Sequence, residues 1–168
     1  GKGLKVINIS DERIREIFAV REALECTAVT FTTERITGEE IRHLEQIVDE
    51  GLRLAHKDDA TEFLASVKRF NRDFIETSKA QNLITMIYTY HEYVNCLRLR
   101  RLAGKDRRLQ AAKEHAAILH AVKHGDSERA KELIHQHLKG SHEYYKKSEE
   151  FARNIDDGEA SLVAGHEI

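Results

Sequence analysis

Six of the ten histidines in this chain of 168 residues lie in one stretch, EHAAILHAVKHGDSERAKELIHQHLKGSH, which spans residues 114–142. Imidazole nitrogens bind transition metals and exchange protons near neutral pH, so the stretch could form a metal site or a catalytic centre. It could also be the solvent-exposed side of two helices. The position of each histidine relative to the apolar residues of its helix distinguishes these possibilities.

Helical periodicity separates the six histidines into two inward and four outward side chains. His115 shares a helix face with Ile118 and Val122, and His137 shares one with Leu133. The other four fall on polar faces and are expected in solvent, namely His120, His124, His135 and His142. His115 and His137 are therefore candidate ligands inside the protein, the alternative being hydrogen-bonded core histidines.

Three further polar residues, Arg21, Asn71 and His91, occupy inward positions of other predicted helices. A buried guanidinium without an opposite charge is unfavourable. Arg21 therefore indicates either an internal ion pair, for which Glu25 is one turn away, or a cavity that accepts an anion. Asn71 and His91 are compatible with a binding site and with hydrogen-bonded core groups.

Two E-x-x-H spacings, Glu40 with His43 and Glu132 with His135, are a pattern found in di-iron enzymes built on helical bundles. A di-iron site needs both motifs directed into the core. Glu132 and His135 fall on a polar face, and His43 lies beside the apolar stripe of its helix. We therefore expect neither pair to bind iron.

The basic cluster RLRRLAGKDRR, residues 98–108, raises the question of nucleic-acid binding. It straddles a predicted turn, lacks aromatic residues, and belongs to a chain with 27 basic and 29 acidic residues. We expect a solvated helix end.

The elements that must position these residues are helices. The sequence contains no proline, and its apolar residues recur with helical spacing. The fold class is predicted as all-α, an antiparallel bundle of about six helices. The expected ranges are about 11–35, 37–57, 59–78, 82–102, 106–124 and 126–154.

The two ends of the chain differ from this pattern. Residues 1–9, GKGLKVINI, are rich in β-branched residues and have strand character. Residues 156–168 lack periodicity and are predicted as a loose tail, which leaves 10–155 for the helical domain.

We find no apolar run of about 20 residues that would cross a membrane. The two cysteines lie in apolar helical stretches, which is typical of a reducing compartment, so we expect a cytoplasmic protein.

Two motifs resemble one protein family. IFAVREALE is similar to the R-x-x-L-E opening of the FCD effector domain, the C-terminal ligand-sensing domain of FadR-subfamily, GntR-type bacterial transcription regulators. EHAAILHAVKHGDSERAKELIHQHL resembles that family's E-H-x-x-I-L-x-A-x-x-x-G-D-x-x-x-A-x-x-x-x-x-x-H-L pattern, including the separation of 22 residues between His115 and His137. Residues 1–9 resemble the closing strand of the winged-helix domain that precedes the effector domain in these regulators.

The resemblance implies a cavity for a small organic acid, often together with a divalent metal. By position, His115 and His137 match two metal ligands, and Arg21 matches a pocket arginine. The family's D-x-x-F-H motif corresponds to VKRFN, which has Val67 at the Asp position and Asn71 at the His position. Valine cannot bind a metal, and an amide oxygen is a poor substitute for imidazole. Binding of Zn²⁺ or Ni²⁺ by His115, His137 and Asn71 therefore stays open.

The leading hypothesis is an effector-sensing domain that binds a small carboxylate through Arg21, Asn71, His91, His115 and His137. It would modulate operator binding by an N-terminal winged-helix domain absent from this chain, with a homodimer as the expected assembly. We expect a regulator and not an enzyme. The alternatives are a metal-dependent enzyme on a helical bundle and a dimerisation module that binds no ligand.

Overall fold

The computed structural model describes the backbone of residues 10–98 and 104–164, and the side chains of residues 10–94 and 104–148. The described part contains six helices and no strand, so the all-α prediction is confirmed. The helices are α1 (Asp11–Arg35), α2 (Gly38–Leu54), α3 (Thr61–Glu76), α4 (Gln81–Arg98), α5 (Lys105–Lys123) and α6 (Ser127–Ala164). Residues 1–9, predicted to close a winged-helix domain, lie outside the described residues.

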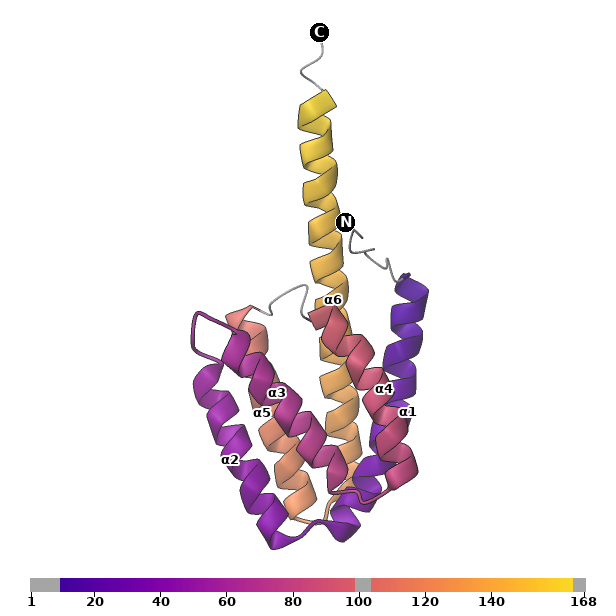
Figure 1. The fold of residues 1–168 in the computed structure, drawn as a ribbon, viewed down its shortest axis with the longest axis vertical. Helices are drawn as coiled ribbons and strands as arrows, with labels where there is room; N and C mark the ends of the chain where they lie inside the picture. The colour runs from indigo at the N-terminus through magenta and orange to yellow at the C-terminus, as the bar shows by residue number, and fades with distance from the viewer. Residues whose placement is uncertain (1–9, 99–103, 165–168) are drawn as a thin grey trace, which may run out of the picture.

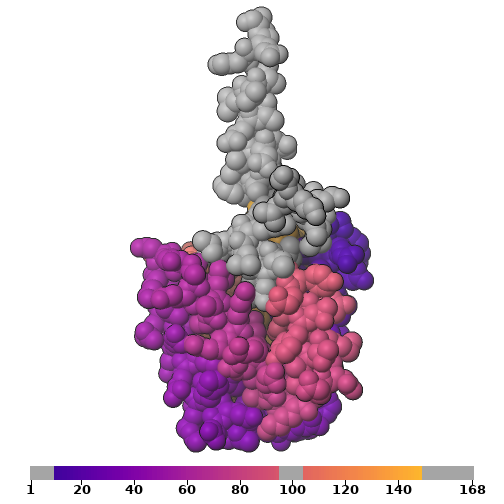
Figure 2. Space-filling view, in the orientation of Figure 1, coloured from indigo at the N-terminus to yellow at the C-terminus, as the bar shows by residue number. Residues whose placement is uncertain are grey.

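The six helices form an antiparallel bundle (Figure 1). Helix α1 packs against α6 and α4, while α5 packs against α6 and α2, and α2 packs against α3. The space-filling view shows α3 and α4 side by side on one face (Figure 2). This arrangement brings α5 and α6, which carry the histidine-rich stretch, next to each other.

Local side-chain contacts explain where several helices begin. Ser10 Oγ accepts a hydrogen bond from Arg13 N at the start of α1. Thr37 and Glu40 form a capping box at the start of α2, as the sequence predicted. Helix α3 begins at Thr61, slightly later than expected, because Asp59 Oδ1 accepts from Thr61 N at 2.8 Å and forms the turn before the helix.

The turn between α5 and α6 depends on Gly125. Its φ of 74° lies in the left-handed region, which glycine adopts without steric cost. Asp126 Oδ1 then accepts from Arg129 N and helps to start α6. This three-residue connection, residues 124–126, fixes the antiparallel register that places His115 near His137.

The core is a continuous apolar cluster supplied by all six helices. Burying each large aliphatic or aromatic side chain contributes about 1.5–3 kcal/mol, which makes this cluster the main source of stability. Fully or almost fully buried members include Ile14, Val29, Leu44, Phe70, Ile87, Val122 and Leu138.

Helix α6 is longer than the sequence predicted. The expected end near Asn154 and the loose tail from residue 156 are wrong for residues 156–164, which continue the helix to Ala164. The segment contains no proline, and its single glycine, Gly158, costs a helix only about 1 kcal/mol. Figure 1 shows this end of α6 continuing beyond the other helices.

The capping box provides a test of the start of α2. We expect Thr37→Ala to lower the free energy of unfolding by about 1 kcal/mol, because Glu40 N loses its acceptor. Urea denaturation followed by circular dichroism measures the change. Thr27→Ala, which removes an exposed hydroxyl from the middle of α1, is the control and should change stability by less than about 0.5 kcal/mol. Equal effects of the two variants would contradict the capping role.

Candidate functional site

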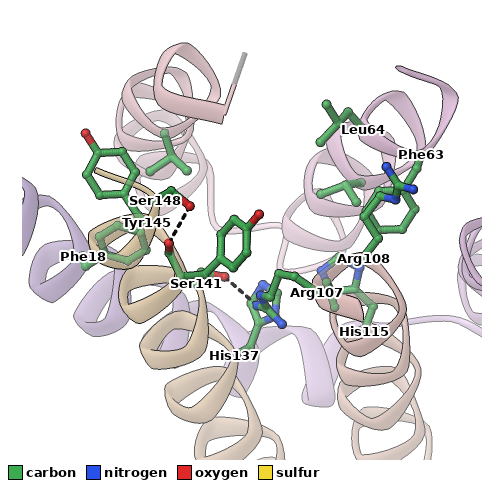
Figure 3. A pocket seen from close by; sticks show the side chains of 14 residues that line it. Phe18, Phe63, Leu64, Arg107, Arg108, His115, His137, Ser141, Tyr145 and Ser148 are labelled. Carbon is green, nitrogen blue, oxygen red and sulfur yellow. Dashed lines mark hydrogen bonds between the residues drawn. The ribbon is translucent and has the colours of Figure 1, made fainter. Parts of the chain in front are cut away.

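A cavity of about 80 Å³ lies among α1, α3, α4, α5 and α6, with room for several water molecules. Part of its wall is apolar and comes from Phe18, Phe63, Leu64, Val67, Val94 and Ala111. The rest is polar and comes from Arg107, Arg108, His115, His137, Ser141, Tyr144, Tyr145 and Ser148. The two inward histidines predicted from the sequence therefore lie on one cavity wall (Figure 3).

A charged network connects α5 to α6 on this wall. The Glu114 carboxylate accepts from Arg107 Nη1 at 3.0 and 3.1 Å, and it lies 2.6 Å from His137 Nδ1. Burial by itself would raise the pKa of Glu114, but the hydrogen bond and charge of His137 and the charge of Arg107 lower it below its usual range. The carboxylate is thus ionised at neutral pH. His137 Nδ1 must donate to it, which leaves Nε2 as the nitrogen for any other contact.

His115 is held by ring contacts. Its imidazole stacks on Phe70, with ring centroids 4.4 Å apart, and its centroid lies 4.9 Å from that of His137. Both histidines are only 5% exposed. The two rings are therefore fixed in place at the base of the cavity.

Arg108 is the most deeply buried cation of the cavity wall, with 3% of its surface exposed. The basic cluster was predicted to be a solvated helix end, and this prediction is wrong for Arg108. The reason is its register on α5, where Arg108 lies seven residues, about two turns, before His115 and so shares its face. Nη2 donates to Lys57 O at 2.6 Å, which joins α5 to the connection between α2 and α3.

Arg21 lies outside the cavity, in an internal ion pair. Its Nε and Nη2 both lie 2.9 Å from Glu25 Oε1, and His91 Nε2 lies 2.9 Å from the same oxygen. Arg21 and His91, predicted as ligand-binding residues, are absent from the lining of this cavity, and Glu25, one helical turn from Arg21, contacts both. The alternative prediction of an internal Arg21–Glu25 pair is confirmed. The cluster ties α1 to α4.

Asn71 also lies outside the cavity. It lines a surface groove with Lys68, Arg72, Tyr88 and His91. Val67 and Phe70 occupy the inward face of this part of α3 and are buried, which leaves Asn71 half-buried at the edge of the helix. Asn71 and the pair His115 and His137 therefore do not converge on one site.

The outward histidines follow the prediction with one exception. His120, His124 and His135 are exposed. His142 was also expected in solvent, but it is half-buried and stacks on Phe18 of α1, with ring centroids 4.8 Å apart. Burial lowers its pKa, which favours the neutral ring in this contact.

The two E-x-x-H pairs do not form a metal site. His43 is exposed and lies 2.8 Å from Asp73 Oδ2, and His135 is exposed and lies 2.8 Å from Glu22 Oε1. Each histidine thus has a carboxylate partner at the surface. The two pairs lie on different helices, α2 and α6.

Comparison with known proteins identifies the family. The sequence profile of the FCD domain matches residues 16–140. The chain belongs to the FCD domain family. A curated relative, the uncharacterised HTH-type transcriptional regulator YdhC of Bacillus subtilis (strain 168), is 23% identical to this FCD domain over 145 residues, which cover 86% of this chain and 65% of that protein. The chain thus spans about two-thirds of the length of this relative.

Solved structures share the FCD fold. E. coli McbR/YncC superimposes with a TM-score of 0.77 at 16% identity, over 84% of this chain and 71% of that one. The metal-free FCD domain of TM0439 superimposes with a TM-score of 0.68 at 21% identity, over 83% and 95% of the two chains. At these identities the comparison establishes the fold alone.

The donor set of this FCD domain does not fit a transition metal. Among the residues that the structure describes, no group of three or more His, Cys, Asp or Glu side chains converges on one point. Val67 places an apolar side chain on the cavity wall at the position that corresponds to the family's aspartate, and Asn71 faces another groove. His115 and His137 alone would leave a four-coordinate ion without two of its protein ligands.

Sequence reasoning missed Arg107, Arg108 and Glu114. The inward position of Arg108 could have been predicted, because the apolar helix face that includes His115 extends back to residue 108. Glu114 lies next to His115 in the sequence, but its role depends on α6, because it is identified only by its contact with His137.

The ion pair of α1 can be tested by mutation. Glu25→Gln leaves the Arg21 guanidinium buried without an opposite charge, so we expect a loss of about 3–5 kcal/mol in the free energy of unfolding. Chemical denaturation at pH 7 measures it. Glu22→Gln, an exposed carboxylate on the same helix, should cost less than about 0.5 kcal/mol.

The same pair predicts how stability depends on pH. Burial raises the pKa of Glu25, but Arg21 and His91 together lower it far more, so the folded-state pKa lies well below the unfolded value of roughly 4.3. Between these values the unfolded chain binds more protons, and stability falls as the pH is lowered below about 4.3. Glu25→Gln should lose this part of the acid dependence. An unchanged acid profile would contradict the assignment.

Proposed function

We propose that this chain is the effector-sensing domain of a GntR-type transcription regulator of the FadR subfamily. The observation that carries the proposal is the cavity between five helices, which has an apolar wall on one side and Arg108, His115 and His137 on the other. A small pocket with a few convergent polar groups is the usual form of a small-molecule site. The effector is a small organic acid, because the cavity contains buried cationic and imidazole donors suited to an anion.

Helix α1 provides a route from the cavity to DNA. Phe18 of α1 lines the cavity and stacks on His142 of α6. Residues 1–9, which precede α1, resemble the end of a winged-helix domain. An effector that contacts Phe18 would favour one position of α1 relative to α6 and so change the placement of attached DNA-binding domains on an operator.

The proposal describes a ligand-responsive binding domain and not an enzyme, and it places the protein in the bacterial cytoplasm. No helix in the described part of the chain is long and apolar enough to cross a membrane. The full regulator would bind its operator through an N-terminal winged-helix domain.

The functional assembly in this proposal is a homodimer. Met86 and Tyr93 of α4 are large apolar side chains that are 50% and 40% exposed, and Tyr90 contacts Tyr93 edge to face. Exposed apolar side chains grouped on one helix are typical of a protein–protein contact. A two-fold axis near α4 would place the two copies of α1 close to one another, because α1 packs on α4.

A substitution that fills the cavity tests the sensing function. We expect small organic acids to raise the melting temperature of the wild-type chain, and Ala111→Leu to abolish this rise, because Ala111 lines the cavity. Differential scanning fluorimetry with a panel of acids, each with and without Ni²⁺ or Zn²⁺, measures the response. Ala117→Leu, on the same helix but away from the cavity, should respond as the wild type does. A wild-type chain that no acid stabilises under any of these conditions would rule out the function.

The dimer is tested by sedimentation velocity. We expect the wild-type chain to sediment as a dimer and Met86→Glu to shift it toward monomer, since a buried unpaired carboxylate is unfavourable. Lys113→Glu, an exposed change on α5, should leave the dimer intact. If the wild-type chain sediments as a monomer at a concentration of about 100 μM, the proposed homodimer is wrong.

A further inference from the structure

We infer that Arg108 supplies the positive charge that binds the effector's carboxylate, in place of a metal ion, and that the effector is a small monocarboxylate with an apolar body. This inference rests on the proposed function of the cavity. It goes beyond the sequence motifs of the family, since Arg108 belongs to neither of the two motifs that carry the resemblance.

The charge of Arg108 is buried and only partly compensated. Nη2 donates to the Lys57 carbonyl, but no acceptor among the described residues lies within hydrogen-bonding distance of the buried Nε. No described carboxylate forms an ion pair with it. Asp58 and Asp59 are exposed and are already bonded to Lys105 and Thr61, and these bonds, with a smaller contribution from the charge of Arg108, lower their pKa values. A guanidinium in this state is expected to gain from an anion that brings a negative charge into the cavity.

Several other polar groups on the wall are already bonded within the protein. Arg107 pairs with Glu114 and donates to Ser141 Oγ. Tyr144 Oη accepts from Gly104 N, and Ser148 Oγ donates to the Tyr144 carbonyl. Figure 3 shows the bond from Arg107 of α5 to Ser141 and the bond of Ser148 within α6. A ligand that needs many polar partners would have to break these bonds, so the cavity favours a ligand with one charged group.

The surface near Arg108 is apolar. Figure 3 shows Arg108 extending from α5 toward Phe63 of α3, with Leu64 beside it. Val67, which replaces the family's metal-binding aspartate, continues this apolar surface. Removing the aspartate takes away a negative charge that would repel a carboxylate, and leaves a surface that favours a hydrocarbon group. The same substitution that weakens a metal site therefore suits direct binding by Arg108.

The test uses this chain after dialysis against EDTA, with isothermal titration calorimetry against phenylacetate and hexanoate. Citrate and gluconate serve as polar competitors. We expect the two monocarboxylates to bind the metal-free chain more tightly than citrate or gluconate. Arg108→Met should weaken this binding roughly 10- to 100-fold, as expected for loss of a buried charged hydrogen bond. Arg108→Gln retains a donor for the Lys57 carbonyl without the charge and should give the same loss. Arg53→Met, an exposed arginine on α2, should bind normally.

The melting temperature without ligand separates a binding role from a structural one. If Arg108 serves the ligand, Arg108→Gln should melt no lower than the wild type, because the substitution removes a buried charge. Three results would each overturn the inference. Both Arg108 variants could bind the monocarboxylates as tightly as the wild type, the wild type could prefer citrate, or binding could require added Ni²⁺ or Zn²⁺. In the last case the proposed sensing function would stand. If no acid binds the wild-type chain with or without metal, the proposed function is wrong, and the inference is wrong with it.

Discussion

Moving a guanidinium or a carboxylate from water into a protein interior costs several kcal/mol unless an opposite charge goes with it, and this bundle buries Arg21, Glu25 and Arg108. Glu25 compensates Arg21 within one helix and accepts a further contact from His91. Arg108 has a backbone carbonyl as its partner and no described carboxylate in ion-pair contact. The same residue type therefore has two roles in one core. The Arg21–Glu25 pair lies within α1, and Glu25 connects it to α4 through His91. In our proposal, Arg108 receives its opposite charge from an anionic ligand.

The two charged clusters lie at different helix contacts. Glu25 and His91 join α1 to α4, while Glu114 and His137 join α5 to α6. The cavity is lined from all four of these helices and from α3. In our proposal, a ligand in the cavity acts on the contacts that are not ionic, because directional ion pairs resist displacement. The Phe18–His142 stack between α1 and α6 is such a contact, and Phe18 lies in the N-terminal half of α1.

The apolar packing of this FCD fold lies apart from the histidines of the cavity wall. The main core cluster comes from all six helices and includes neither His115 nor His137. Val67, on the cavity wall, offers an apolar surface and no metal donor. Function in this fold is decided by the few side chains on the cavity wall.

The sequence by itself determined the all-α class, the six helices, the capping box at Thr37 and the inward positions of His115 and His137, because each depends on local spacing along one helix. It also indicated Glu25 as a partner for Arg21, one turn away. Only the tertiary structure decided that Arg21, Asn71 and His91 lie outside the cavity, that Glu114 orients His137, and that Arg108 is buried on the wall. These facts depend on how helices distant in the sequence are rotated against one another, and helical periodicity indicates which side of a helix is buried without indicating which neighbour covers it.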